Sequence, residues 1–153
     1  MSVDMSRYLG LFVSESTEHL DSLGRELVDL EKQPKEKIPS VVDSMFRHAH
    51  SVKGMAASMG FEPIATLAHR VEDLIDPART DPSVLSREIV DLLLASTDAL
   101  LSQVRTAADS KAPEPVPQLV AQLDAKVKEL TGKAPQPTRV ADAIVSQVTP
   151  DSA

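Results

Sequence analysis

Residues 46–60 read Phe-Arg-His-Ala-His-Ser-Val-Lys-Gly-Met-Ala-Ala-Ser-Met-Gly, and this stretch decides the fold. Its apolar side chains recur every three or four residues, which is the period of a helix with one buried face. Gly60 stands where a glycine commonly closes a helix. The stretch therefore predicts the second half of an amphipathic helix that spans about residues 39–59.

The same spacing of apolar residues predicts three further long helices. They span about residues 4–31, 63–77 and 82–107. Pro77 is predicted to close the second of these helices. Asp81, as N-cap, and Pro82, at the first helical position, predict the start of the third. Aromatic residues make up only 3% of the chain, so the core must be aliphatic, which suits helices better than a sheet sandwich. We expect an all-α fold, an antiparallel up-down four-helix bundle.

Several prolines occur in the last third of the chain. Pro113, Pro115 and Pro117 occupy alternate positions, which predicts an extended connector. The apolar residues that follow predict an additional short fifth helix, which ends at Gly132. We expect one helical domain over residues 1–132 and a Pro-rich linker or disordered tail over residues 133–153.

Composition excludes several classes of function. The net charge of −7 disfavours binding to nucleic acid and to anionic membrane surfaces, and the absence of cysteine excludes disulfides and thiolate metal sites. The chain has no apolar run long enough to cross a membrane and no signal peptide at its start, so we expect a cytoplasmic protein.

His50 is the most promising reactive residue. On the predicted helix it shares a face with Lys53 and Gly54, while Ala49 and Val52 fall on the buried stripe, so its imidazole should point outward. A glycine inside a helix costs about 0.5–1 kcal/mol relative to alanine. Two interpretations of Gly54 stay open: a large group approaches the imidazole, or another helix packs closely against the glycine.

The next helix carries His69 and Glu72 three residues apart on one flank. If the two helices form a hairpin around Gly60, this flank can face His50, and a carboxylate on one ring nitrogen leaves the other nitrogen as a nucleophile. Lys53 can supply positive charge to a phosphoryl group. The alternative is that Glu72 and Lys53 are ordinary solvated charges.

The two remaining histidines lie elsewhere. His48 is about 200° around the helix from His50, so it cannot share the same site. We expect His48 and His19 to be solvated surface residues.

The run His50-Ser51-Val52-Lys53-Gly54, with Ala56 and Gly60-Phe61, resembles the histidine phosphotransfer motif. More narrowly, about residues 4–130 resemble the N-terminal phosphotransfer domain of CheA-type chemotaxis histidine kinases. The resemblance implies that His50 accepts the phosphoryl group, that Glu72 bonds its ring, that Lys53 and His69 complete the polar network and that Gly54 keeps the approach open. Met55 departs from the family, which commonly has a second small residue there, and should affect partner docking rather than chemistry.

The function that this resemblance implies is a phosphorelay module of two-component signalling. Its partners would be a histidine kinase catalytic domain, which donates the phosphoryl group, and a response-regulator receiver domain, whose aspartate accepts it. The five glycines are scattered, so this chain has no glycine-rich phosphate loop and no kinase catalytic site. We expect no cofactor or metal in the chain itself, ATP and Mg bound by the partner domains, and a monomer.

Two other functions were weighed against this one. A di-iron bundle needs two Glu-x-x-His motifs, and the chain has only the reversed pair His69-x-x-Glu72. A non-catalytic helical adaptor is the serious alternative, because bundles of this kind host many functions.

Overall fold

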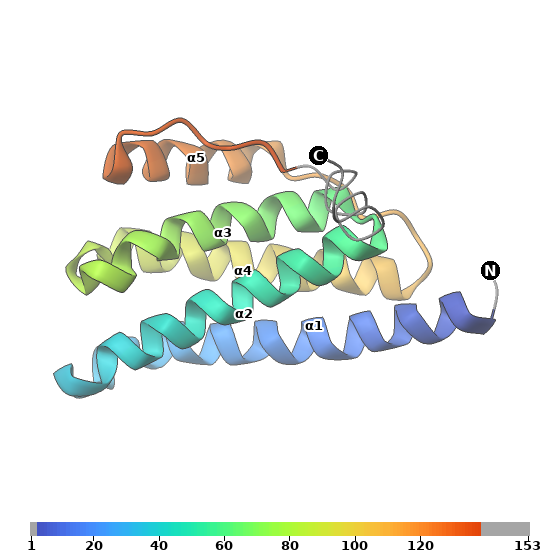
Figure 1. Ribbon diagram of the computed structural model, residues 1–153, viewed down its shortest axis with the longest axis horizontal. Helices are drawn as coiled ribbons and strands as arrows, with labels where there is room; N and C mark the ends of the chain where they lie inside the picture. The colour runs from blue at the N-terminus through green and yellow to red at the C-terminus, as the bar shows by residue number, and fades with distance from the viewer. Residues whose placement is uncertain (1–2, 139–153) are drawn as a thin grey trace, which may run out of the picture.

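The computed structural model describes residues 3–138, and all regular secondary structure within that range is helical, with no strand. Five α-helices follow in order: α1 (Val3–Asp29), α2 (Ile38–Met59), α3 (Glu62–Thr80), α4 (Arg87–Ala108) and α5 (Pro117–Thr131). Three single 3-10 turns, η1 (Leu30–Lys32), η2 (Lys35–Lys37) and η3 (Pro82–Val84), lie in the connections. The prediction of an all-α fold with a short fifth helix is confirmed (Figure 1).

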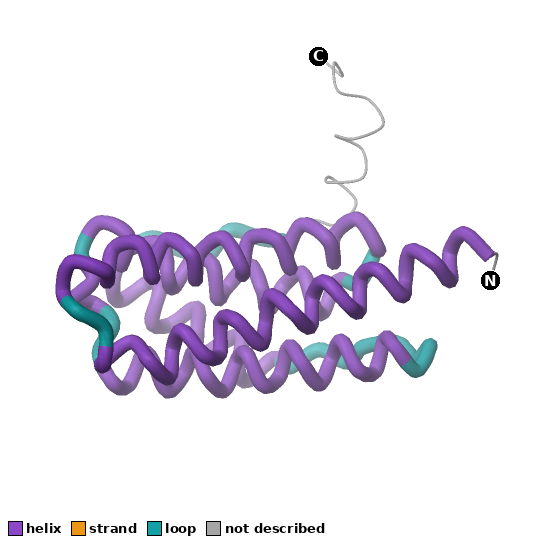
Figure 2. The backbone as a smooth tube through the Cα atoms, turned by 90° about the horizontal axis from the view of Figure 1, so that it is seen from below, coloured by secondary structure: helices purple, strands orange, loops and turns teal. Residues whose placement is uncertain are grey.

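The first four helices form an antiparallel bundle. Helix α1 packs against α2 and α4, and α3 packs against the same two helices from the other side. Helix α5 lies on the outside of the bundle along α3, as Figure 1 shows, and the view from below in Figure 2 shows the up-down course of the chain. The largest fully buried side chains come from all five helices: Leu20, Leu23, Leu27, Val42, Met45, Ile64, Leu67, Leu74, Ile75, Leu93, Leu100 and Leu123.

The turn between α2 and α3 sets the register of the functional residues. Gly60 caps α2 in the left-handed conformation, with φ 77°, and its N–H bonds the carbonyl oxygens of Ala56 and Ala57, as the sequence predicts. The chain reverses within two residues, so α3 runs back along α2. Residues at comparable distances before and after Gly60, such as His50 and Glu72, are thereby brought to the same level of the hairpin.

The prediction that Pro77 closes the third helix is wrong. Pro77 lies inside α3, which continues to Thr80. Tertiary contacts hold this last turn, because Ala78 is fully buried and the Arg79 guanidinium lies 4.1 Å from the centre of the Phe46 ring on α2. These contacts outweigh the backbone hydrogen bond that a proline forfeits.

The predicted start of the fourth helix is also wrong. Asp81 does act as a cap, but of the turn η3, where its carboxylate accepts a hydrogen bond from the Ser83 N–H. Helix α4 begins only at Arg87, and Ser86 is its N-cap, with Oγ accepting from the Ile89 N–H at 3.3 Å. The side chain of Leu85 packs against the core in between, which the helical spacing alone does not reveal.

Helix α5 is fixed by an ion pair and leads into a returning segment. The Nε atom of Arg70, a buried residue on α3, lies 2.6 Å from Oδ1 of Asp124 on α5. After Gly132 the chain runs back alongside α5 as far as Thr138 (Figure 1). Residues 139–153, most of the predicted tail, lie outside the described residues.

No helix within residues 3–138 is long and apolar enough to cross a membrane.

Candidate functional site

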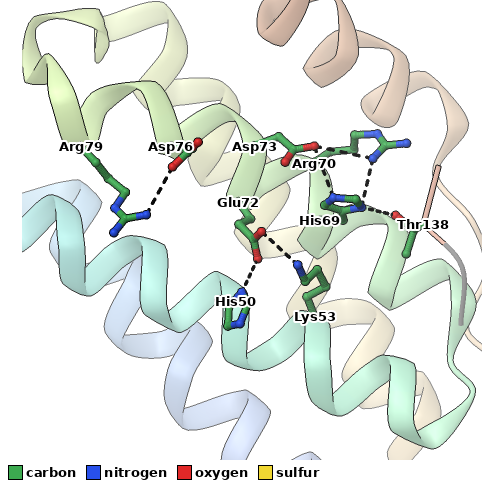
Figure 3. Close-up of polar contacts among 9 residues, drawn as sticks. All are labelled: His50, Lys53, His69, Arg70, Glu72, Asp73, Asp76, Arg79 and Thr138. Atoms are coloured by element: carbon green, nitrogen blue, oxygen red, sulfur yellow. Dashed lines mark hydrogen bonds and ion pairs between the residues drawn. The ribbon is translucent and has the colours of Figure 1, made fainter. Parts of the chain in front are cut away.

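His50 projects from the middle of α2 and is held by Glu72 on α3 (Figure 3). Its side chain is 61% exposed, and its Nδ1 atom lies 2.8 Å from Oε2 of Glu72. Because an ionised carboxylate can only accept hydrogen bonds, Nδ1 must carry the proton that is shared with Glu72. The lone pair therefore resides on Nε2, the other ring nitrogen, which is the arrangement a nucleophilic imidazole requires.

Glu72 is a buried carboxylate with a second partner. Its side chain is only 11% exposed, and Nζ of Lys53 donates a hydrogen bond to Oε1 at 3.0 Å. Burial of an ion pair costs solvation free energy, so such a pair is a weak source of stability. The structure thus brings together His50, Lys53 and Glu72 as predicted, and it excludes the alternative in which Glu72 is a freely solvated charge.

One face of the His50 ring lies next to Phe46, one helical turn earlier on α2. The two ring planes are 15° apart, with centroids separated by 6.1 Å. On Phe46 in turn lies the Arg79 guanidinium, which also pairs with Asp43 and Asp76. In the sequence pattern Phe46 is only one apolar residue among those of the predicted helix. Its spacing of four residues from His50 was the signal that would have identified it as a neighbour.

Gly54 lies open to solvent beside His50. A Cβ atom built on it would meet no other atom within 4 Å, so the interpretation in which another helix packs against Gly54 is wrong. Gly54 and His50 line one hollow between α1 and α2. Two exposed apolar residues on α1, Tyr8 (57%) and Leu11 (54%), line its other wall, and Met55 faces the same hollow. The surface beside the imidazole is therefore accessible and partly apolar.

His69 lies behind Glu72, with its ring turned towards the returning segment. The Arg70 guanidinium donates to Nδ1 of His69 at 3.3 Å, the Thr138 hydroxyl contacts the same nitrogen at 2.5 Å, and Nε2 lies 3.6 Å from Oδ2 of Asp73 (Figure 3). Burial lowers the pKa of His69 and raises the pKa of Asp73. The contacts of His69 thus run to Arg70, Asp73 and Thr138, and its role in phosphotransfer stays a prediction.

Among residues 3–138, His69, Glu72 and Asp73 form the group of three whose ligand atoms all lie within 4.8 Å of one another, as a metal ion would require. Two cations already neutralise the carboxylates: Lys53 pairs with Glu72, and Arg70 lies 3.8 Å from Asp73. A metal ion would have to compete with these two cations for the carboxylates, and of the three residues only Glu72 contacts His50.

The prediction that His19 and His48 are solvated surface residues is wrong. The two rings meet across the α1–α2 interface, with their Nδ1 atoms 2.8 Å apart, and both residues are half-buried. His48 lies on the side of α2 that meets α1, and the helical period of α2 alone could not show which helix packs there.

Comparison with known proteins agrees with this geometry. The sequence matches the Hpt domain family over residues 7–132. The chain belongs to the Hpt domain family. The family expected from the sequence is therefore confirmed, and with it the class of function, a phosphorelay module.

The curated relatives include chemotaxis proteins named CheA. The chain is 36% identical over 107 residues to the chemotaxis protein CheA of Bacillus subtilis (strain 168), which covers 70% of this chain and 16% of that protein. It is 38% identical over 96 residues to CheA of Listeria monocytogenes, and this match covers 63% of this chain and 15% of that protein. The chain therefore spans about a sixth of the length of these relatives.

Two solved structures share the fold. The phosphorylated P1 domain of CheA3, in complex with CheY6 from R. sphaeroides, superposes with a TM-score of 0.72 at 27% identity, covering 82% of this chain and 99% of that one. The solution structure of the histidine phosphotransfer domain of CheA gives a TM-score of 0.66 at 28% identity, covering 88% and 97%. The bundle with its fifth helix is thus the architecture of this family.

The Gly54→Ala substitution separates stability from accessibility. We expect the free energy of unfolding to rise by about 0.5–1 kcal/mol, because alanine favours helix and its methyl group meets no neighbour. Phosphoryl transfer should nevertheless slow, since the methyl group occupies the approach to His50. Urea denaturation and transfer kinetics measure the two effects. Gly10→Ala, which also meets no neighbour, is the matched control and should be stabilising without slowing transfer; an unchanged rate for Gly54→Ala would contradict the assigned role.

Proposed function

We propose that His50 accepts a phosphoryl group from ATP bound in a histidine kinase catalytic domain, and then passes it to an aspartate of a response-regulator receiver domain. The observation that carries this proposal is the 2.8 Å contact between Glu72 and Nδ1 of an imidazole that is otherwise exposed. This contact assigns the free lone pair to Nε2, on the solvent-facing side of the site.

In the first step the Nε2 lone pair attacks the γ-phosphorus of ATP. The Nε2–P bond forms as the bond to the bridging oxygen breaks, and ADP leaves with that electron pair. The proton on Nδ1 stays in place, so the ring becomes a cation, which the Glu72 carboxylate stabilises. Lys53, paired with Glu72, adds positive charge near the incoming phosphoryl oxygens.

In the second step a carboxylate oxygen of the receiver's aspartate attacks the phosphorus. The N–P bond breaks and its electron pair returns to Nε2, which regenerates neutral His50 with its proton still on Nδ1. No proton transfer is needed within this chain in either step. Glu72 therefore serves to orient the ring and stabilise its charge, not to act as a base.

The two steps require one partner domain that binds ATP and a second partner domain that carries the accepting aspartate. ATP and Mg are held by the partner domains, since the five glycines of this chain form no phosphate-binding loop. The two-domain route is supported by relatives that are chemotaxis proteins named CheA and by a related P1 domain captured with CheY6. We further propose a cytoplasmic monomer that binds no nucleic acid, consistent with the net charge of −7 and the absence of cysteine.

His50→Gln is the direct test of the acceptor. Incubation with ATP and the catalytic core of a CheA-type kinase that phosphorylates the wild-type chain should leave the variant unlabelled, because the amide lacks a nucleophilic nitrogen. Thermal stability should change little, since the His50 side chain is mostly exposed. The label on the wild type should be acid-labile and alkali-stable. Equal labelling of the variant would exclude His50, and a wild type that its cognate kinase does not label would favour the non-catalytic adaptor.

Glu72→Ala tests the orienting carboxylate. We expect the phosphorylation rate of His50 to fall roughly 10- to 100-fold, the range seen when a partner that orients a functional histidine is removed. Glu72→Gln keeps an oxygen that can accept from Nδ1 and should recover part of the rate. Rates come from rapid-quench labelling, with urea denaturation as the folding control. A folded Glu72→Ala variant with the wild-type rate would remove Glu72 from the mechanism.

A further inference from the structure

His19 and His48 form a contact that phosphotransfer does not use. His19 comes from α1 and His48 from α2, their ring centroids are 5.1 Å apart, and the two Nδ1 atoms lie 2.8 Å from each other. Two ring nitrogens at this distance cannot both be protonated, so one ring donates to the lone pair of the other. Two imidazole nitrogens from different helices are therefore held close together.

The surroundings of this pair are acidic. The described residues that line the hollow beside it are Glu15, Glu18, His19, Ser22 and His48, which include two carboxylates and no lysine or arginine. Glu15 precedes His19 by four residues and so shares its face of α1. On the other side of His48, Oε1 of Glu26 lies 3.6 Å from Nε2. Arg47 also acts on His48, but it is turned towards Asp43, at 3.4 Å.

We propose that His19 and His48 bind a divalent transition-metal ion of the Zn²⁺ type, with the carboxylate of Glu15 and water completing the coordination. Bonds of 2.0–2.1 Å from a tetrahedral zinc ion place two nitrogen ligands about 3.3 Å apart. Starting from 2.8 Å, the rings need to separate by only about 0.5 Å, which side-chain rotation supplies. Glu15 has to turn across the hollow that it already lines.

The charge balance favours this site over the group around His69. There the two carboxylates are neutralised by Lys53 and Arg70. No lysine or arginine lines the hollow that Glu15 and Glu18 face, and the cation at its edge, Arg25, donates a hydrogen bond to Ser22 at 3.3 Å.

Such an ion would join α1 to α2, the helix that carries His50. Because the two histidines are 29 residues apart and meet only in the folded chain, the ion should bind the native state far better than the unfolded one. Ligands with this preference raise the melting temperature, and the stabilisation grows with the logarithm of the ligand concentration divided by its Kd.

Titration of the 153-residue chain with ZnCl₂ tests the proposal, by isothermal calorimetry and by ¹⁵N NMR of the histidine rings. We expect micromolar binding with one ion per chain, and shifts at the ring nitrogens of His19 and His48. His19→Gln and His48→Gln should each weaken binding more than about tenfold, and Glu15→Gln should weaken it less. His69→Gln is the matched control and should bind Zn²⁺ as the wild type does.

Several results would overturn the proposal. The absence of Zn²⁺ binding by the wild-type chain would do so, and so would full binding by either the His19→Gln or the His48→Gln variant. Loss of binding in His69→Gln alone would place the ion with Glu72 and Asp73 instead. A circular dichroism spectrum of each variant verifies that lost binding does not reflect lost folding.

Discussion

The Glu72 carboxylate lies between two helices, where it accepts one hydrogen bond from Nδ1 of His50 at 2.8 Å and another from Lys53 at 3.0 Å. This shared carboxylate determines the chemistry of the site, because it fixes which nitrogen of an exposed imidazole carries the proton. It is also costly, since a buried charge loses hydration that its partners only partly replace. A bundle that needed only to fold would have an apolar residue there.

The rest of the structure places that carboxylate. The left-handed cap at Gly60 turns α3 back along α2, and an aliphatic core packs the two helices so closely that Glu72 reaches His50. On the outer side, Gly54 leaves the approach to the imidazole free of side-chain atoms, and Tyr8 and Leu11 of α1 supply apolar surface next to it. The inner side of the imidazole is thus held while its outer side stays accessible, as the proposed transfer between two partner domains requires.

Much of this arrangement was predictable from local pattern. The period of apolar residues predicted all five helices, and the His50, Lys53 and Glu72 spacings, combined with a hairpin at Gly60, predicted their contact. What the pattern missed depends on contacts between distant segments. Pro77 stays within α3 because Arg79 packs on Phe46, and α4 begins at Arg87 rather than Pro82 because Leu85 packs into the core first. The meeting of His19 with His48 and that of His69 with Thr138 likewise require the packed bundle.

In the proposed mechanism Glu72 holds the proton on Nδ1 of His50 and so reserves Nε2 for the phosphoryl group. The most direct measurement is ³¹P and ¹⁵N NMR of the phosphorylated chain, with ¹⁵N in the histidine rings, to identify which nitrogen of His50 is bonded to phosphorus. The account predicts a phosphorus coupling to Nε2, with the proton retained on Nδ1. A phosphoryl group on Nδ1 would contradict it, because the bond to Glu72 would then have to break before the reaction, and the geometry described above would not be the reactive one.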